Sequence, residues 1–295
     1  MEKLVLDKMN KFLLRNNMIS INARPSYWDS GHTKEKYMHR LSARVRGEEI
    51  TEYIGGKFNA KDRDKDDTCI FVKPRNLTNI KDGDYVDLLD DTGLIPLLKM
   101  RPKIKIIAMS DVHFEHLKQE LNNEIILIPH HHINFEREKR TRNKSLVGGM
   151  IGSPSKMVYE IVDKIKEALA GVEIEFTICF NSRTKQEMIS YYKSIDFLVN
   201  WYLDIYKRDA FSRHPAKIIN AASFGIPTLA QPILGYREVE GFYIPIETVD
   251  DIVREAIKLK DVNYYNKWSS KITKEAEKYH ISNVTKLYQN LCKTT

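Results

Sequence analysis

The residues best suited to chemistry lie in the segment SRHPAKIINAASFGIPTLAQPILGYRE, which runs from Ser212 to Glu238. Pro215 favours the first turn of a helix there, and an apolar, strand-like run over Phe197–Tyr202 precedes it. The amides of that first turn, with Arg213 and Lys217, would face the crevice at the carboxyl ends of the strands. Helix N-termini and cations both attract phosphate, so the pattern predicts an anion site. An ordinary capped helix with a solvated lysine explains the same residues.

A second candidate pair is Asp111 and His113, in the stretch SDVHFEH. Both follow the strand-like run Lys103–Met109, so they are expected at the carboxyl end of that strand. A carboxylate or an imidazole in this place would be able to orient or deprotonate a hydroxyl group. Asp111 acting as the N-cap of a helix over Val112–Leu121 accounts for the carboxylate equally well.

A metal site is the alternative that the acidic and histidine clusters raise. Gly83–Asp91 (GDYVDLLDD) and Ser110–His116 superficially match metallophosphoesterase fragments, whose carboxylates and imidazoles hold two metal ions. In that family the D-x-H fragment comes first and a G-N-H-E element follows, whereas here the order is reversed and no Gly-Asn-His occurs. The run His130–His132 ends a strand, where successive side chains alternate faces and cannot all reach one ion. We therefore expect no metal.

These residues need a scaffold, and short apolar runs alternate with windows of helical period along almost the whole chain. Ten runs have strand length: Met18–Asn22, Cys69–Val72, Tyr85–Leu89, Lys103–Met109, Glu124–Pro129, Leu146–Ile151, Ile174–Phe180, Phe197–Tyr202, Pro227–Ala230 and Phe242–Ile246. Buried strands that alternate with amphipathic helices indicate parallel sheets covered on both faces. The expected fold class is therefore α/β.

Local signals place several of the helices. A stripe of aliphatic residues from Val158 to Leu169 predicts one helix, and Gly225 is expected to cap the helix of the 212–238 segment. Thr248 and Asp251 have the spacing of a capping box, which opens another helix. The tail Asn263–Thr295 has the pattern of two further helices.

Composition limits the class of protein. The 295 residues suit about two domains, and the charged stretch Asn134–Ser145 near the midpoint is where a polar linker is expected. With 42% hydrophobic and 29% charged residues, the chain is neither a disordered tail nor a disulfide scaffold. Its three cysteines form no C-x-x-C pair, no apolar run approaches the ~20 residues of a membrane span, and charges interrupt the N-terminal apolar stretch. We therefore expect a cytoplasmic protein.

The segment AKIINAASFGIPTLA…GYREV resembles the donor-site segment of GT-B glycosyltransferases, especially the retaining nucleotide-sugar enzymes of the family-4 type. VGGMIG resembles the strand and glycine turn that begin their donor domain, and IILIPHHHIN the strand entering their interdomain linker. The resemblance implies two Rossmann-like domains facing each other across a cleft, with C-terminal helices crossing back. The implied parts are an acceptor-side domain over 1–136, a donor-binding domain over 137–262 and returning helices over 263–295.

The resemblance also implies a donor site. It comprises Gly152, Asn181, Arg183, Arg213, Lys217, Asn220, Tyr236 and Glu238. In this interpretation Arg213 and Lys217 neutralise the diphosphate without a metal, and Gly152 lets the backbone approach the phosphates. Asn181–Arg183 would lie near the nucleobase, and Glu238 near the ribose or the sugar. Many retaining members carry two glutamates eight residues apart, where this chain has Ser212 and Asn220.

The acceptor side is the least defined. GT-B enzymes place a glycine-containing acceptor loop after the first strand, and here that loop offers Tyr27, Trp28, Asp29 and the pliable Gly31. An aromatic face beside a hydroxyl acceptor suits a sugar or a base. In the same interpretation the histidine run, His131 in particular, lines the interdomain cleft.

The function implied is transfer of a sugar from a UDP- or GDP-linked donor to a hydroxyl group, with no cofactor. Asp111 and His113 are the catalytic candidates. The net charge of +7 and the basic run His32–Arg46 allow two acceptors, a glycan or glycoconjugate and the hydroxymethylated bases of viral DNA. We expect the glycan, since the solvated face of a helix explains the basic run. A non-catalytic protein that binds a nucleotide sugar or nucleic acid is the alternative of another class.

Overall fold

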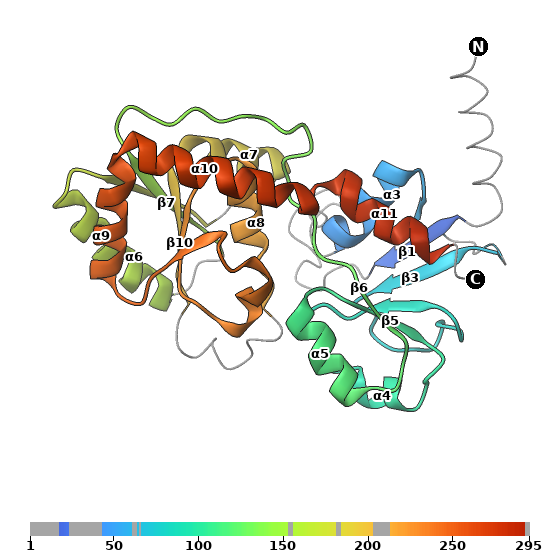
Figure 1. The fold of residues 1–295 in the computed structure, drawn as a ribbon. Coiled ribbons are helices and arrows are strands. Elements are labelled where there is room, and N and C mark those ends of the chain that lie inside the picture. Colours follow the sequence, from blue (N-terminus) through green and yellow to red (C-terminus); the bar gives the residue numbers. More distant parts are fainter. Residues whose placement is uncertain are drawn as a thin grey trace, which may run out of the picture. The chain divides into compact units, whose positions relative to one another are not determined.

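The computed structural model describes residues 18–23, 43–60, 64, 66–152, 156–180, 184–202 and 213–292. These residues form two compact units, one from residues up to His130 together with those from Ile281 on, the other from His131 to His280 (Figure 1). The division falls after His130 rather than after Glu136. Of the two C-terminal helices, only the last belongs to the first unit.

The first unit is built on a six-stranded sheet in which every pairing is parallel. In spatial order its strands are β2 (Lys57–Phe58), β1 (Ile19–Ala23), β3 (Thr68–Val72), β4 (Tyr85–Asp87), β5 (Lys105–Ala108) and β6 (Ile125–Leu127). Its helical elements are a π-helical turn η1 (Arg44–Glu48), α3 (Glu49–Ile54), α4 (Ile95–Lys99), α5 (Asp111–Glu120) and α11 (Ile281–Leu291). Helices α3 and α11 lie side by side (Figure 1).

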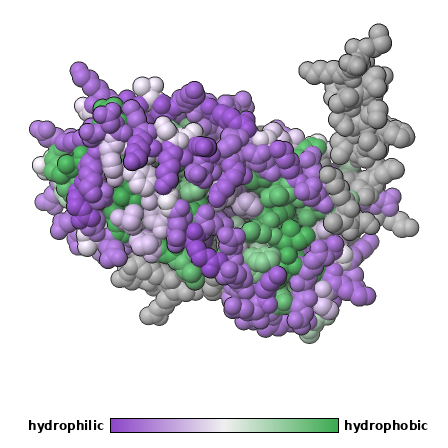
Figure 2. Space-filling view, in the orientation of Figure 1, coloured by the Kyte–Doolittle hydropathy of each residue, from purple (hydrophilic) through white to green (hydrophobic). Residues whose placement is uncertain are grey.

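The second unit holds a five-stranded sheet, also parallel throughout. The strands in spatial order are β11 (Tyr243–Pro245), β10 (Thr228–Ala230), β9 (Phe197–Asn200), β7 (Val147–Ile151) and β8 (Glu175–Cys179). Around it lie α6 (Lys156–Ala170), α7 (Lys185–Ser194), α8 (Ala216–Ser223), α9 (Val249–Lys260), α10 (Val262–Ala276) and the 3-10 turns η4 (Leu234–Val239) and η5 (Glu277–Tyr279). The outer face of α10 is hydrophilic in Figure 2, while its Tyr265 and Ile272 are buried.

The α/β class is confirmed, and each of the ten predicted strands coincides with an observed one. Thr248 and Asp251 form the predicted capping box of α9. Gly225 follows the C-cap of α8 at φ +69°, the left-handed conformation that favours glycine. At α5 the cap differs from the alternative raised above: Ser110 is the N-cap, its Oγ accepting from the His113 amide at 3.2 Å, and Asp111 is the first helical residue.

The charged stretch 134–145, where a polar linker is expected, is anchored to the second unit by buried side chains. Arg140 ion-pairs with Asp196, both almost fully buried, and donates to Tyr265 Oη at 2.7 Å. Asp196 also accepts from the backbone amides of Asn143 and Val147, each at 2.8 Å. Since Asp196 immediately precedes β9, these contacts tie the entry to β7 to the start of the neighbouring strand.

Arg46 corrects the expectation of a solvated basic face. Its side chain is 1% exposed, ion-pairs with Asp87 at 2.7 Å and donates to the Ile128 and Pro129 carbonyls at 2.9 and 2.8 Å. The guanidinium also lies over the Tyr288 ring of α11, 5.6 Å from its centroid. Arg46 therefore holds η1, β4, the end of β6 and α11 together. The remainder of the basic run, from His32 to Ser42, lies outside the described residues.

Candidate functional site

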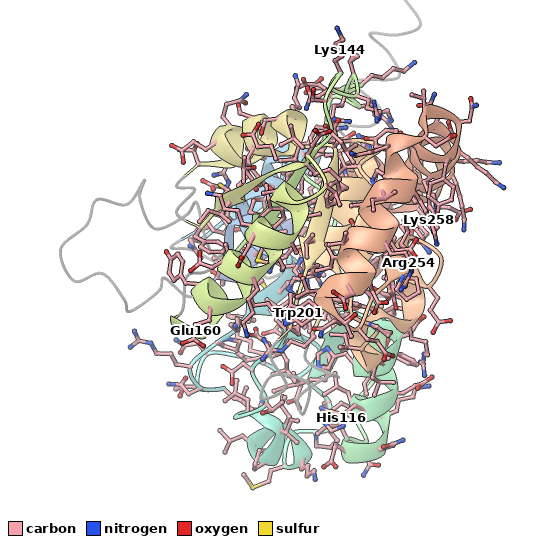
Figure 3. The ribbon with its side chains drawn as sticks, turned by 90° about the vertical axis from the view of Figure 1, so that its left-hand side faces the viewer. His116, Lys144, Glu160, Trp201, Arg254 and Lys258 are labelled. Atoms are coloured by element: carbon pink, nitrogen blue, oxygen red, sulfur yellow. The ribbon has the colours of Figure 1, made fainter. Side chains whose placement is uncertain are left out.

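The strand order of the second unit reverses between β7 and β9. The chain passes from β7 to β8 on one side, then to β9, β10 and β11 on the other. In parallel sheets this reversal opens a crevice at the carboxyl ends of the two central strands, where ligands bind. Gly152 follows β7 and Trp201 follows β9, so both lie at this end of the sheet, as Figure 3 shows for the labelled Trp201. Lys144, which precedes β7, lies at the opposite end in the same view.

Gly152 and Lys217 meet at this crevice, although they are far apart in the sequence. A β-carbon added at Gly152 would lie 3.1 Å from Lys217 Nζ. Any side chain at position 152 would thus press against the ammonium group. A glycine beside a cation leaves room for a phosphate to approach the backbone, which is the arrangement predicted for the donor phosphates.

Arg213 and Lys217 lie together at the start of α8. Arg213 Cζ and Lys217 Nζ are 6.0 and 5.9 Å from the centroid of the Tyr202 ring. Burial, and secondly the charge of Arg213, lower the pKa of Lys217 to about 8. An anionic ligand would oppose this shift and raise the pKa of Lys217, because it favours the charged form of the amine. We name Gly152, Tyr202, Arg213 and Lys217 the switch-point site.

Tyr236 lies behind this site rather than in it. Its side chain is 1% exposed, its Oη accepts from Asn200 Nδ2 at 2.6 Å, and its ring packs edge-on against Tyr202 at 6.0 Å. Burial raises its pKa well above the usual value, so the phenol stays neutral. Glu238 is half-buried on the same 3-10 turn, η4. Tyr236, which was predicted to bind the donor, therefore supports the Tyr202 side chain of the site.

Asn220 is engaged within the second unit. Its Oδ1 accepts from the Ile133 amide at 3.0 Å, and its side chain hydrogen-bonds to the buried phenol of Tyr192. These contacts fasten α8 to the 131–135 segment. The same contacts engage the carboxamide of Asn220, which was predicted to bind the donor.

Comparisons with known proteins bear on the fold. The sequence matches no protein-family model and no curated protein. Among solved structures, a glycosyltransferase from Rickettsia africae ESF-5 superposes with a TM-score of 0.56 at 10% identity, covering 95% of this chain and 98% of that one. HepE of Anabaena, in complex with UDP and glucose, superposes with a TM-score of 0.55 at 10% identity, covering 94% and 99%. The chain has a glycosyltransferase fold.

Two longer proteins match this chain over part of their length. TarM gives a TM-score of 0.50 at 16% identity, and the GtfA/B complex 0.51 at 11%. This chain spans just over half of their lengths, 55% of TarM and 57% of the GtfA/B chain.

In the first unit of this glycosyltransferase fold, His113 is a buried neutral imidazole. Its Nδ1 accepts from the Met109 amide at 3.3 Å, which assigns the proton to Nε2. Burial, followed by the charges of His116 and Arg46, lowers its pKa to about 4. Because Nδ1 already serves the backbone, His113 is not placed to accept a proton from a substrate. Asp111 is half-buried on the first turn of α5, where a carboxylate is favourable.

The histidine run is packed into the protein. His131 is 4% exposed and its Nδ1 lies 3.1 Å from the His132 carbonyl oxygen. His132 and His280 pack edge-on with centroids 5.3 Å apart, and burial, followed by the charge of His280, lowers the pKa of His132 to about 3. Within the described ranges, no three His, Cys, Asp or Glu side chains gather as a metal site requires. The fold shared with known glycosyltransferases does not favour the metallophosphoesterase interpretation.

Several predicted site residues lie outside the described residues: Asn181, Arg183, Tyr27, Trp28, Asp29 and Gly31. Of the helices that the structure describes, each is too short or too polar to traverse a bilayer. Sequence reasoning missed Tyr202, which it treated only as the end of a strand. An aromatic residue at the carboxyl end of a central strand is the signal that would have found it.

Proposed function

We propose that this chain is a glycosyltransferase that binds a nucleoside diphosphate sugar at the switch-point site and transfers the sugar to a hydroxyl group. The observation that carries the proposal is the ammonium group of Lys217 beside Gly152, with Arg213 at the start of α8. Two cations, a helix N-terminus and a glycine turn at the strand-order reversal together suit a diphosphate. The fold, shared with HepE in complex with UDP and glucose, supports a UDP-linked donor.

In this proposal the two units divide the work. The second unit binds the donor and the first unit the acceptor. Arg213 and Lys217 neutralise the leaving diphosphate without a metal, and Glu238 contacts the ribose or the sugar. Asp111 is the candidate to orient the acceptor hydroxyl from the first turn of α5. His113 instead supports the β5–α5 turn through its bond to Met109.

The acceptor we propose is a glycan or glycoconjugate. DNA is the less favoured acceptor, because Arg46 is buried in an ion pair and Arg44 pairs with Glu49 at 3.2 Å, so neither is a free phosphate ligand. The two acceptors can be distinguished by incubating the protein and sugar donors with hydroxymethylated DNA and with simple glycosides. The acceptor that gains the mass of the sugar is the substrate. A DNA enzyme would in addition bind duplex with an affinity that falls steeply with salt.

The test of the donor site is calorimetric titration with UDP, GDP and ADP. We expect Lys217→Ala to weaken binding of the preferred diphosphate by about 1–3 kcal/mol, the range of a charge-assisted hydrogen bond. Lys166→Ala, an exposed lysine in the last turns of α6, is the matched control and should bind as the wild type does. Equal affinity in wild type and Lys217→Ala for every diphosphate would refute the assignment. Release of the nucleoside diphosphate from a sugar donor would exclude a non-catalytic binding protein.

A further inference from the structure

Tyr202 lies where the two cations of the switch-point site converge. Its ring centroid is 6.0 Å from Arg213 Cζ and 5.9 Å from Lys217 Nζ. Both distances fall within the reach of a cation–π interaction, in which the negative face of the ring attracts the charge. One aromatic side chain therefore contacts both groups that the proposed function assigns to the diphosphate.

Buried neighbours hold Tyr202 in place. Its backbone amide donates to Gln231 Oε1 at 2.7 Å, and Gln231 is 5% exposed at the end of β10. Its ring packs edge-on against Tyr236, which Asn200 Nδ2 binds through the phenol oxygen at 2.6 Å. Tyr236 in turn packs against Tyr243 with centroids 5.8 Å apart. Gln231 thus fixes the backbone of Tyr202, and Tyr236 of η4 fixes its ring.

Two neighbouring cations repel each other, and an aromatic ring can stabilise them without competing with an anionic ligand as a carboxylate would. Arg213 and Lys217 repel each other, and Arg213 is one of the two causes that lower the pKa of Lys217. A carboxylate at the position of Tyr202 would relieve the repulsion, but it would compete with any anionic ligand for both cations. An aromatic face attracts a cation less strongly than a phosphate oxygen does. The ring can hold both groups and still release them to a diphosphate.

We propose that Tyr202 is a positioning residue that holds Arg213 and Lys217 ready for the diphosphate of the donor. The inference rests on the proposed function of the same site. The aromatic ring, rather than the hydroxyl group, performs this role, because the ring faces both cations while the hydroxyl hydrogen-bonds to Tyr236.

Calorimetric titration of UDP into the whole chain tests the inference. Tyr202→Leu removes the ring, and we expect the affinity for UDP to fall on the order of tenfold, since two cation–π contacts are lost. Tyr202→Phe keeps the ring and should bind UDP within about twofold of the wild type. Thermal melts of both variants identify any loss of folding, and the Phe variant keeps the test valid if Leu fails to fold.

Two further readouts separate positioning from a merely structural role. A ring that favours the charged amine raises the pKa of Lys217, so in Tyr202→Leu the affinity for UDP should decline at a lower pH than in wild type. In a Lys217→Ala background the effect of Tyr202→Leu should shrink, because one of its two partners is gone. A structural defect would leave the pH profile in place and add in full to Lys217→Ala.

The outcomes distinguish this inference from the proposed function. If the wild type binds no nucleoside diphosphate, the proposed function fails. If the wild type binds UDP but Tyr202→Leu matches it in affinity and pH profile, only the role of Tyr202 is refuted. A Phe variant as weak as the Leu variant would assign the effect to the hydroxyl group instead and overturn the inference.

Discussion

At the scale of single residues, the charge of Lys217 lowers the stability of the fold and favours the binding of an anion. Its amine is half-buried beside Arg213, with its pKa lowered to about 8 by that burial and by the neighbouring charge. Keeping it protonated at neutral pH therefore costs folding free energy, while an arriving diphosphate gains from the same charge. Sites built to bind anions commonly sacrifice stability in this way.

This conflict predicts opposite effects of Lys217→Met on stability and on binding. A free lysine titrates near 10.5 and Lys217 near 8, so the unfolded chain binds more protons between these values, and this group's contribution to stability rises with pH there. We expect Lys217→Met to raise the melting temperature at pH 7 and to bind UDP weakly, with the thermal difference shrinking toward pH 10. Melting curves at pH 7 and pH 10 check this, and a lower melting temperature for Lys217→Met at pH 7 would contradict it.

At the scale of elements, α8 is placed by contacts at its C-terminal end rather than at the end that faces the ligand. Gly225 turns the chain after α8, and a β-carbon there would lie 2.4 Å from Ser269 Oγ of α10. Asn220 joins the same helix to Ile133. With its far end fixed, the amides of the first turn stay aimed at the crevice beside Arg213 and Lys217.

The two reasons for glycine at position 225 can be separated. Gly225→Ala forces a left-handed φ and a collision with α10, so we expect a loss of about 2–3 kcal/mol in the free energy of unfolding. Gly55→Ala is the matched comparison, since Gly55 ends α3 at φ +73° with nothing within 4 Å of its added β-carbon, and it should lose only about 1 kcal/mol. Urea denaturation measures both. Equal losses would show that α10 yields to the extra methyl group.

At the scale of the whole molecule, the chain leaves the first unit after His130 and returns to it at Ile281. The two segments of the second unit next to these passages are joined to each other. The His132 amide donates to the Tyr279 carbonyl at 2.9 Å, His280 Nε2 lies 2.9 Å from the Phe135 carbonyl oxygen, and Arg137 pairs with Glu277 at 2.7 Å. The start and the end of the second unit thus form one anchored structure.

Each unit contains a buried histidine that must stay neutral, and this predicts sensitivity to acid. The pKa of His113 is lowered to about 4 and that of His132 to about 3. Below pH 6.5 these histidines therefore bind protons in the unfolded chain but not in the folded chain. Stability should fall as the pH drops from 6.5 toward 4, by about 2 kcal/mol per histidine at pH 5. His113→Gln and His132→Gln should each flatten this decline in urea denaturation series. A pH dependence unchanged in the double variant would rule out these histidines as the cause.

The sequence by itself determined most of the local structure. Ten strands, the capping box at Thr248 and the glycine after α8 follow from apolar runs and from side chains that bond to their own neighbours, which are short-range effects. Elements without such signals were missed. Strand β2 has two residues and exists through its pairing with β1, α3 packs against the distant α11, and α4 has only five residues. Helix α7 was missed although Thr184 and Glu187 form a capping box at its start.

The resemblance to known enzymes grouped Gly152, Arg213 and Lys217, but only the tertiary structure decided how closely they lie and which other side chains join them. Lys217 and Gly152 come together because β7 and β9 are neighbours in the sheet, a pairing that no local pattern encodes. The same long-range packing placed the Tyr202 ring about 6 Å from each of two cations and buried Arg46 against Asp87. A charged residue looks alike in sequence whether it is solvated or paired. Its environment is set by strands and helices that lie far away along the chain.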